Sequence, residues 1–187
     1  ESARMSHGPS TADGAVLHAA PHDHLDEPYV PVFTAGSASK TTLDDILSRY
    51  PTRQAALLPA LWLVQGERGW ISEHAMKEVA DVLGLTAAYV KGVVTFYTMY
   101  HLHPVGKWFI QVCTTSCCNC MGAEDVVKAF LQQTGCGDLG VTSADGRYTV
   151  IEVECLGACG FATPIMINED FIESVTVEKV PALLKKY

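Results

Sequence analysis

Two pairs of cysteines, each placed just after an expected β-strand, constrain the fold of this chain more than any other feature. Residues 108–112 and 148–153 are rich in apolar and β-branched side chains, as buried strands are, and residues 123–131 between them have the 3.6-residue period of a helix. A helical crossover joins parallel strands, and the carboxyl ends of parallel strands share one edge of a sheet. The sequence therefore predicts that the two cysteine loops meet at that edge.

The spacing within each loop indicates what the thiols bind. The first loop holds Cys113 and Cys118 in a C-x4-C spacing, and the second holds Cys155 and Cys159 in a C-x3-C spacing. Each pair can take one iron and two sulfides can bridge the irons, which makes a [2Fe–2S] cluster that carries one electron. Such a cluster is negatively charged, so backbone N–H groups must point at its sulfurs, and glycines in the second loop allow that approach.

The number and spacing of the cysteines also indicate the redox state of the compartment and the metal that the thiols bind. The cysteine count is seven, an odd number, and no signal-peptide pattern precedes them, which argues against a secreted disulfide framework and for metal ligation in a reducing compartment. The alternative is a structural Zn²⁺ held by four thiolates. Zinc ribbons favour C-x2-C knuckles, and neither pair has that spacing, so iron and sulfide are favoured over zinc.

The charge balance narrows the choice of partners. Lys and Arg total 13 against 21 Asp and Glu, which gives a formal net charge of −8. Nucleic acids and anionic membrane surfaces require a basic face, so neither is expected as a partner. No stretch approaches the roughly 20 apolar residues that span a bilayer. Any association with a membrane is therefore expected to go through a partner complex.

Residues 1–41 are expected to form an extended tail. They are rich in Gly, Ser, Ala, Pro and His, have no helical or strand period, and carry more acidic than basic residues. A mitochondrial transit peptide is Arg-rich and poor in acids, so this segment is not an intact one. Only residues 28–33 are apolar enough to be buried. We expect them to dock on a partner or to act as a linker, and not to build a core of their own.

Residues 42–103 are expected to form a small helical bundle, because short loops separate amphipathic helices there. The expected helix starts are Thr42, Arg53, Ser72 and Thr86. In the second helix, Leu57, Leu58, Leu61 and Trp62 are predicted to share one face. The aromatic cluster of Phe96, Tyr97 and Tyr100 is expected to be core, since aromatic side chains dominate buried area.

Residues 104–187 change to an α/β pattern. After the strand–helix–strand unit come two short strands at 165–167 and 171–175 and a last helix at 177–184. This order is typical of a compact thioredoxin-like layer. The predicted fold class is therefore α+β, an N-terminal helical bundle followed by a thioredoxin-like [2Fe–2S] ferredoxin domain.

Four segments carry a family resemblance. They are residues 56–59, 95–100, 105–115 and 153–159. Together they resemble the thioredoxin-like [2Fe–2S] subunit of the NADH-oxidising module of respiratory complex I, and the resemblance runs from about Thr42 to the C-terminus. The family spacing selects Cys118 as the second ligand. Cys117 stands where the family often has proline, and Cys120 is a further unexpected thiol.

The resemblance implies an electron-transfer subunit with no catalytic residue of its own. It implies a partner subunit that binds FMN and NADH, neighbouring iron–sulfur subunits in the peripheral arm, and a cluster that lies beside the main electron path. The expected location is the cytoplasmic face of a bacterial inner membrane, as part of a complex. The matrix side of the mitochondrial inner membrane is the alternative.

Two other assemblies fit the same residues. One is the diaphorase part of a soluble NAD-linked hydrogenase or formate dehydrogenase, and the other is a stand-alone thioredoxin-like ferredoxin. Residues 135–140 spell G-x-G-x-x-G. They follow an expected helix and lead towards a strand, which is the reverse of the dinucleotide-binding order, so we expect a loop there.

Overall fold

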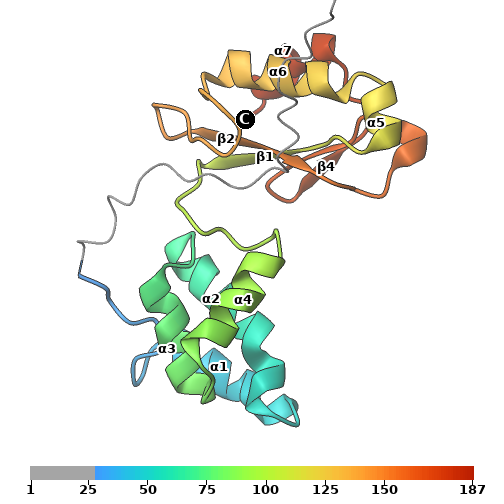
Figure 1. Cartoon of the computed structure of the whole chain (residues 1–187). Coiled ribbons are helices and arrows are strands. Elements are labelled where there is room, and N and C mark those ends of the chain that lie inside the picture. The colour runs from blue at the N-terminus through green and yellow to red at the C-terminus, as the bar shows by residue number, and fades with distance from the viewer. Residues whose placement is uncertain (1–27) are drawn as a thin grey trace, which may run out of the picture.

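The computed structural model describes residues 28–187 and shows a group of helices followed by a sheet layer (Figure 1). The helical unit contains α1 (Ala38–Arg49), the 3₁₀ turn η1 (Arg53–Ala56), α2 (Leu57–Arg68), α3 (Glu73–Leu83) and α4 (Ala87–Phe96). One hydrophobic core unites these helices, and a separate core lies between the sheet and its helices. The predicted α+β class, with the helices before the sheet, is confirmed.

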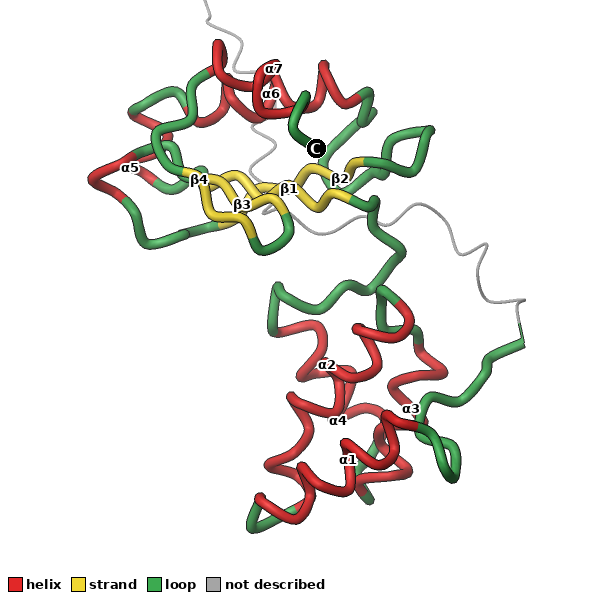
Figure 2. The backbone as a smooth tube through the Cα atoms, turned by 180° about the vertical axis from the view of Figure 1, so that it is seen from behind, coloured by secondary structure: helices red, strands yellow, loops and turns green. Residues whose placement is uncertain are grey.

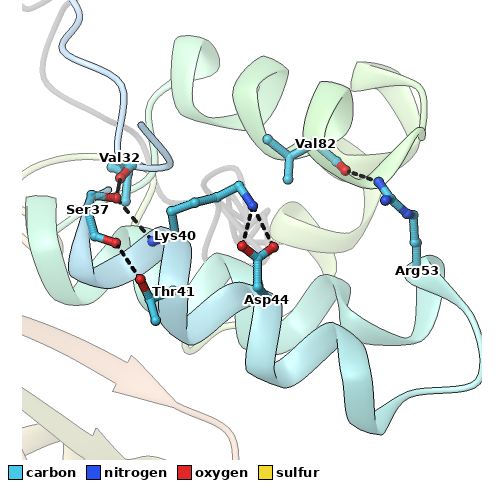
Figure 3. Close-up of polar contacts among 7 residues, drawn as sticks. All are labelled: Val32, Ser37, Lys40, Thr41, Asp44, Arg53 and Val82. Atoms are coloured by element: carbon cyan, nitrogen blue, oxygen red, sulfur yellow. Dashed lines mark hydrogen bonds and ion pairs between the residues drawn. The ribbon is translucent and has the colours of Figure 1, made fainter. Parts of the chain in front are cut away.

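Side-chain caps explain where the helices begin. Ser72 and Thr86 cap α3 and α4 as predicted, each accepting a hydrogen bond from a backbone N–H in the first turn. The first helix begins at Ala38, earlier than the start predicted at Thr42. Its cap is Ser37, whose Oγ accepts from the N–H of Lys40 at 3.1 Å (Figure 3).

Polar contacts around α1 and η1 fix the connections of the helical unit (Figure 3). Lys40 Nζ lies 2.6 Å from Asp44 Oδ2, one helical turn further on. Arg53 Nη1 donates to the backbone carbonyl of Val82 at 2.9 Å, which ties the turn before α2 to the end of α3. Because that carbonyl lies in the last turn of its helix, the guanidinium satisfies an acceptor that lacks a partner within the helix.

Residues 29–33 pack onto the helical unit as a strap. Val32 and Phe33 are 3% and 7% exposed and belong to its core. The carboxylate of Glu78 accepts from the backbone N–H of Val32 at 3.0 Å and of Phe33 at 2.7 Å, and also from the Tyr29 hydroxyl. The expectation that this apolar segment docks on a partner or acts as a linker is therefore wrong, because it packs into the core of the chain's own helical unit. The rest of the predicted tail, residues 1–27, lies outside the described residues, and the division at 41 and 103 stays a prediction.

Replacing Glu78 with alanine is expected to lower the free energy of unfolding of the helical unit by about 1–3 kcal/mol, because the strap's backbone N–H groups lose their acceptor. Urea unfolding measures the change. Glu73→Ala on the same helix is the matched control. Glu73 is exposed and pairs only with Lys91 on the surface, so its loss should cost less than about 1 kcal/mol. Equal losses of unfolding free energy in the two variants would show that the hydrogen bonds of Glu78 to the strap do not stabilise the helical unit.

The aromatic cluster at the end of α4 is only partly core. Tyr100 is 2% exposed, and its hydroxyl donates to the carbonyl of Leu58 at 3.0 Å. Phe96, however, is 76% exposed. Helix α4 turns Val90 and Val94 inwards, and Phe96, two positions after Val94, falls on the opposite side of the helix. The prediction of a buried cluster is correct for Tyr100 and wrong for Phe96.

A similar correction applies to α2. The predicted apolar face contained four side chains, but only two of them are buried in the structure. Leu57 and Leu61 are buried, whereas Leu58 and Trp62 are exposed to a third or more. The buried stripe of this helix runs through Leu57, Leu61 and Val64, and α1 and α3 contact the helix.

The sheet has four strands in the order β2-β1-β3-β4. The strands are β1 (Trp108–Cys113), β2 (Tyr148–Val153), β3 (Ile165–Ile167) and β4 (Asp170–Ile172). Strands β1 and β2 pair in parallel, as predicted from the crossover, and the other neighbours are antiparallel. Strand β4 ends before the predicted 175, since Ser174 has a φ of 53° that interrupts extended structure.

Helices cover one face of this sheet (Figures 1 and 2). They are α6 (Ala123–Thr134), which is the crossover between β1 and β2, and α7 (Val180–Leu184), which follows the 3₁₀ turn η3 (Val177–Lys179). Inward side chains such as Ile110, Val150 and Phe130 form the core between the layers. Helix α6 ends at Gly135, whose φ is 72°, so the G-x-G-x-x-G segment leaves a helix as expected.

The chain between the two units is anchored on the first residues of β2. Gly106 donates its N–H to Thr149 Oγ1 at 2.7 Å, and Lys107 donates to the carbonyl of Gly146 at 3.2 Å. The ring of His101 meets that of Phe109 edge-on, with 4.5 Å between ring centroids. The end of the helical unit therefore contacts the sheet face that α6 and α7 leave uncovered.

Among residues 28–187, no single helix is both long and apolar enough to cross a membrane. Helices α3 and α4 reach that length and composition only as a pair, and the pair is bent by 119°.

Candidate iron–sulfur centre

The two cysteine loops leave neighbouring parallel strands at the same edge of the sheet. Cys113 is the last residue of β1, not the first residue after it as predicted, and it lies opposite Val153, the last residue of β2. The N–H of Thr114 donates to the carbonyl of Val153 at 3.1 Å, which holds the starts of the loops together. Cys155 follows two positions later. The predicted juxtaposition of the loops is therefore present in the fold.

Cys113 and Cys118 form an inner pair. Their sulfurs lie 3.3 Å apart, and the two residues are 2% and 1% exposed. Two thiolates on one tetrahedral metal at about 2.3 Å lie about 3.8 Å apart, so this pair is close to the spacing that one iron requires. A short helix that the sequence analysis did not predict, α5 (Ser116–Cys120), turns Cys118 inwards. There it packs with Ala123 at the start of α6.

Cys155 and Cys159 form an outer pair, and both are exposed. The N–H of Gly157 donates to Cys155 Sγ at 3.4 Å. Gly157 has a φ of 77°, a conformation that glycine adopts without strain, and the turn it makes aims its N–H back at the sulfur. This is the N–H to sulfur arrangement expected for the second loop. Gly160 has no such φ, and the 3₁₀ turn η2 (Cys159–Phe161) holds it.

The pKa values of the two inner thiols are shifted in opposite directions. Burial favours the neutral form of Cys113, but hydrogen bonds from the backbone N–H groups of Thr115 and Leu156 and from the Cys118 thiol outweigh burial and lower its pKa. Burial, and next the neighbouring Cys113, raise the pKa of Cys118 to about 12. Cys118 therefore keeps its proton at neutral pH, and a metal that binds there must displace it.

A fifth thiol lies at the site. The pKa of Cys159 is raised, first by the charge of Cys117 and next by burial. Cys117 is exposed on α5, whereas its neighbour Cys118 is buried with Cys113. No spacing rule in the sequence signals an influence of Cys117 on Cys159, because the two residues lie in elements that follow different strands.

The remaining thiols lie elsewhere. Cys120 is exposed at the end of α5. Cys136 is buried in the core of the sheet unit, where its sulfur contacts the carbonyl of Tyr148 at 3.4 Å. Across residues 28–187, no three or more His, Cys, Asp or Glu side chains are grouped as a site for one metal ion. The donor chemistry, two thiol pairs at one sheet edge, fits two irons with one pair on each, and this ligand set stays a prediction.

Comparison with known proteins gives matches over most of the chain. The sequence profile of the family described as thioredoxin-like [2Fe-2S] ferredoxin matches residues 43–187. The E subunit of NADH-quinone oxidoreductase from Rickettsia bellii is 39% identical over 157 residues, which cover 82% of this chain and 93% of that protein. The protein of the same name from Pseudomonas aeruginosa is 37% identical over 155 residues, covering 83% and 93%.

A solved structure shares the fold. Part of the NAD+-reducing [NiFe]-hydrogenase, in its air-oxidized crystal structure, superposes with a TM-score of 0.60 at 20% identity. The match covers 70% of this chain and 22% of the hydrogenase chain. At that identity the likeness concerns the fold alone.

Proposed function

This chain belongs to the thioredoxin-like [2Fe–2S] ferredoxin family, and on that basis we propose that it is the electron-transfer component of an NADH:quinone oxidoreductase. The match to the family profile and to the two relatives confirms the family resemblance predicted from the sequence. The observation that carries the proposal is the meeting of two thiol pairs at the carboxyl edge of β1 and β2. Similarity to the two bacterial relatives over nearly their full length supports the assignment to a complex.

The proposed ligands are Cys113 and Cys118 for one iron and Cys155 and Cys159 for the other. When bound, a [2Fe–2S] cluster supplies one-electron exchange. The chain's own residues hold it and adjust its surroundings. Burial keeps water from the inner pair, and the N–H of Gly157 stabilises negative charge on Cys155.

The division of labour is also proposed. FMN and NADH bind a partner subunit, the cluster exchanges one electron with that FMN, and the isolated chain oxidises no NADH. Other iron–sulfur subunits of the peripheral arm are the further neighbours. The complex lies at the cytoplasmic face of a bacterial inner membrane, a location supported by the bacterial source of the relatives.

The purified full chain should contain two irons and two acid-labile sulfides, and its reduced form should give a rhombic, near-axial EPR signal. NADH alone should leave it oxidised. Addition of the flavin-bearing partner should allow NADH to reduce it, because the partner supplies the step from hydride to single electrons. A colourless chain that contains zinc would refute the cluster, and NADH oxidation by the single chain would refute the division of labour.

The second candidate is the diaphorase part of an NAD-linked hydrogenase, which the shared fold with the NAD+-reducing [NiFe]-hydrogenase supports. Mass spectrometry of the intact assembly, purified through this chain, separates the two. Quinone-linked membrane subunits are expected. Hydrogenase or formate dehydrogenase subunits in their place would support the second candidate and contradict the first.

A further inference from the structure

One buried hydroxyl near the inner thiol pair has no hydrogen-bond partner. Thr163 is 1% exposed, and among residues 28–187 its Oγ1 is the one buried side-chain oxygen or nitrogen that makes no hydrogen bond. A buried hydroxyl without a partner costs free energy, so native proteins rarely keep one without a reason. We therefore expect the acceptor for this hydroxyl to be a group that binds to the chain.

The neighbours of Thr163 place it at the sheet edge where the cysteine loops meet. Ala162, the residue before it, packs against the buried group that Cys113 and Cys118 form with the start of α6. The carbonyl of Pro164, the residue after it, accepts from the N–H of Cys113 at 3.2 Å. Thr163 therefore lies between a residue that packs against the inner pair and a residue that bonds to the backbone of that pair.

The adjoining stretch of chain does not accept a hydrogen bond from this hydroxyl. Ala162 and Pro164 have no polar side-chain atom. The carbonyl of Thr163 accepts from the N–H of Val175 at 2.9 Å, and the carbonyl of Pro164 is used by Cys113. The thiolates and sulfides of an iron–sulfur centre are negatively charged, and they accept hydrogen bonds from the protein around them.

We propose that the Thr163 hydroxyl donates a hydrogen bond to a sulfur of the [2Fe–2S] centre and thereby raises its reduction potential. The inference rests on the proposed function, because the acceptor is the centre that the four proposed cysteines hold. Reduction adds one negative charge to the iron and sulfur atoms, so a donor stabilises the reduced form more than the oxidised form. No covalent bond forms or breaks, and the proton stays on the hydroxyl.

The midpoint potential of the full, cluster-loaded chain tests the proposal. Thr163→Val keeps the branched shape and removes the hydroxyl. We expect the equilibrium constant for one-electron reduction to fall by about tenfold, which corresponds to about 59 mV. Thr163→Ser keeps a hydroxyl and should retain the potential of the wild-type chain. A redox titration with dithionite and mediators, followed by EPR, measures the potential without any partner subunit.

Thr134→Val is the matched control. Thr134 is a buried hydroxyl in the same sheet unit, but it already donates to the carbonyl of Phe130 at 2.7 Å, so its removal should leave the potential unchanged. Urea unfolding of the cluster-free chain should separate the two variants in the other direction. Thr134→Val should be less stable than wild type because a hydrogen bond is lost, whereas Thr163→Val should be at least as stable because an unpaired hydroxyl is removed.

An intact cluster with an unchanged potential in Thr163→Val would overturn the proposal. So would a loss of stability in cluster-free Thr163→Val equal to that of Thr134→Val, because the hydroxyl would then have a partner in the cluster-free chain. If valine keeps the cluster out, Thr163→Ala removes the hydroxyl with less bulk and gives the same measurement. Loss of the cluster from both variants with retention in Thr163→Ser would support the hydrogen bond. Failure of the wild-type chain to bind iron and sulfide would count against the proposed function alone.

Discussion

Cys118→Ser is expected to reduce the iron content and the visible iron–sulfur absorption of the chain to background, whereas Cys117→Ser is expected to keep both. The structural reason is the opposite placement of these two neighbours. Cys118 is buried with its sulfur 3.3 Å from that of Cys113, close to the spacing that one iron requires. Cys117 is exposed on α5. Serine at 118 removes a proposed thiolate ligand of the cluster. Serine at 117 removes only an exposed thiol next to that ligand in the chain.

Iron and sulfide analysis, visible absorption and EPR of the two variants, purified under reducing conditions, measure the difference. Cys120→Ser is the control for an exposed thiol on α5, and Cys136→Ala is the control for a buried thiol outside the site. Replacing 117, 120 and 136 together should still leave one [2Fe–2S] centre. Loss of colour in Cys117→Ser with colour retained in Cys118→Ser would show that the ligand assignment is wrong.

Gly106→Ala is expected to destabilise the sheet unit by about 1–3 kcal/mol, the usual range for inserting a carbon into a tightly packed site. A Cβ atom at this position would lie 2.7 Å from backbone atoms of Tyr148 and 2.9 Å from the carbonyl carbon of Arg147. Backbone atoms cannot rotate away as a side chain can. The linker must therefore move, and it then loses the 2.7 Å hydrogen bond from the Gly106 N–H to Thr149.

Amide hydrogen exchange in β1 and β2 measures this effect where it arises. Gly92→Ala provides the control, because Gly92 lies inside α4 and an added Cβ would meet no atom within 4 Å beyond its own stretch of helix. That change should stabilise the helical unit by about 0.5–1 kcal/mol, since alanine favours helix over glycine. Unchanged exchange protection in Gly106→Ala would show that the linker does not contact β2 as closely as the structure has it.

Features set by near neighbours in the chain could be predicted from the sequence. Ser72 and Thr86 cap their helices because a hydroxyl just before a helix meets free N–H groups in its first turn. The parallel pairing of β1 and β2 follows from the helical crossover between them, because such a connection is right-handed and brings the chain back in the same direction. The rule for parallel strands is enough to predict that Cys113 and Cys155 lie at one sheet edge, without reference to any side-chain contact.

Features that depend on contacts between distant segments were decided only in the tertiary structure. The strap is held by Glu78, a surface position of α3 as far as its helical period shows, so no local pattern predicts that Val32 and Phe33 pack onto the chain's own helices. Likewise, α5 buries Cys118 beside Cys113 and leaves Cys117 exposed. Local rules predict that cysteine loops gather at this edge, whereas the packing of α5 against α6 decides that Cys118 is the buried thiol, because side-chain direction in so short a helix is set by its neighbours and not by its own period.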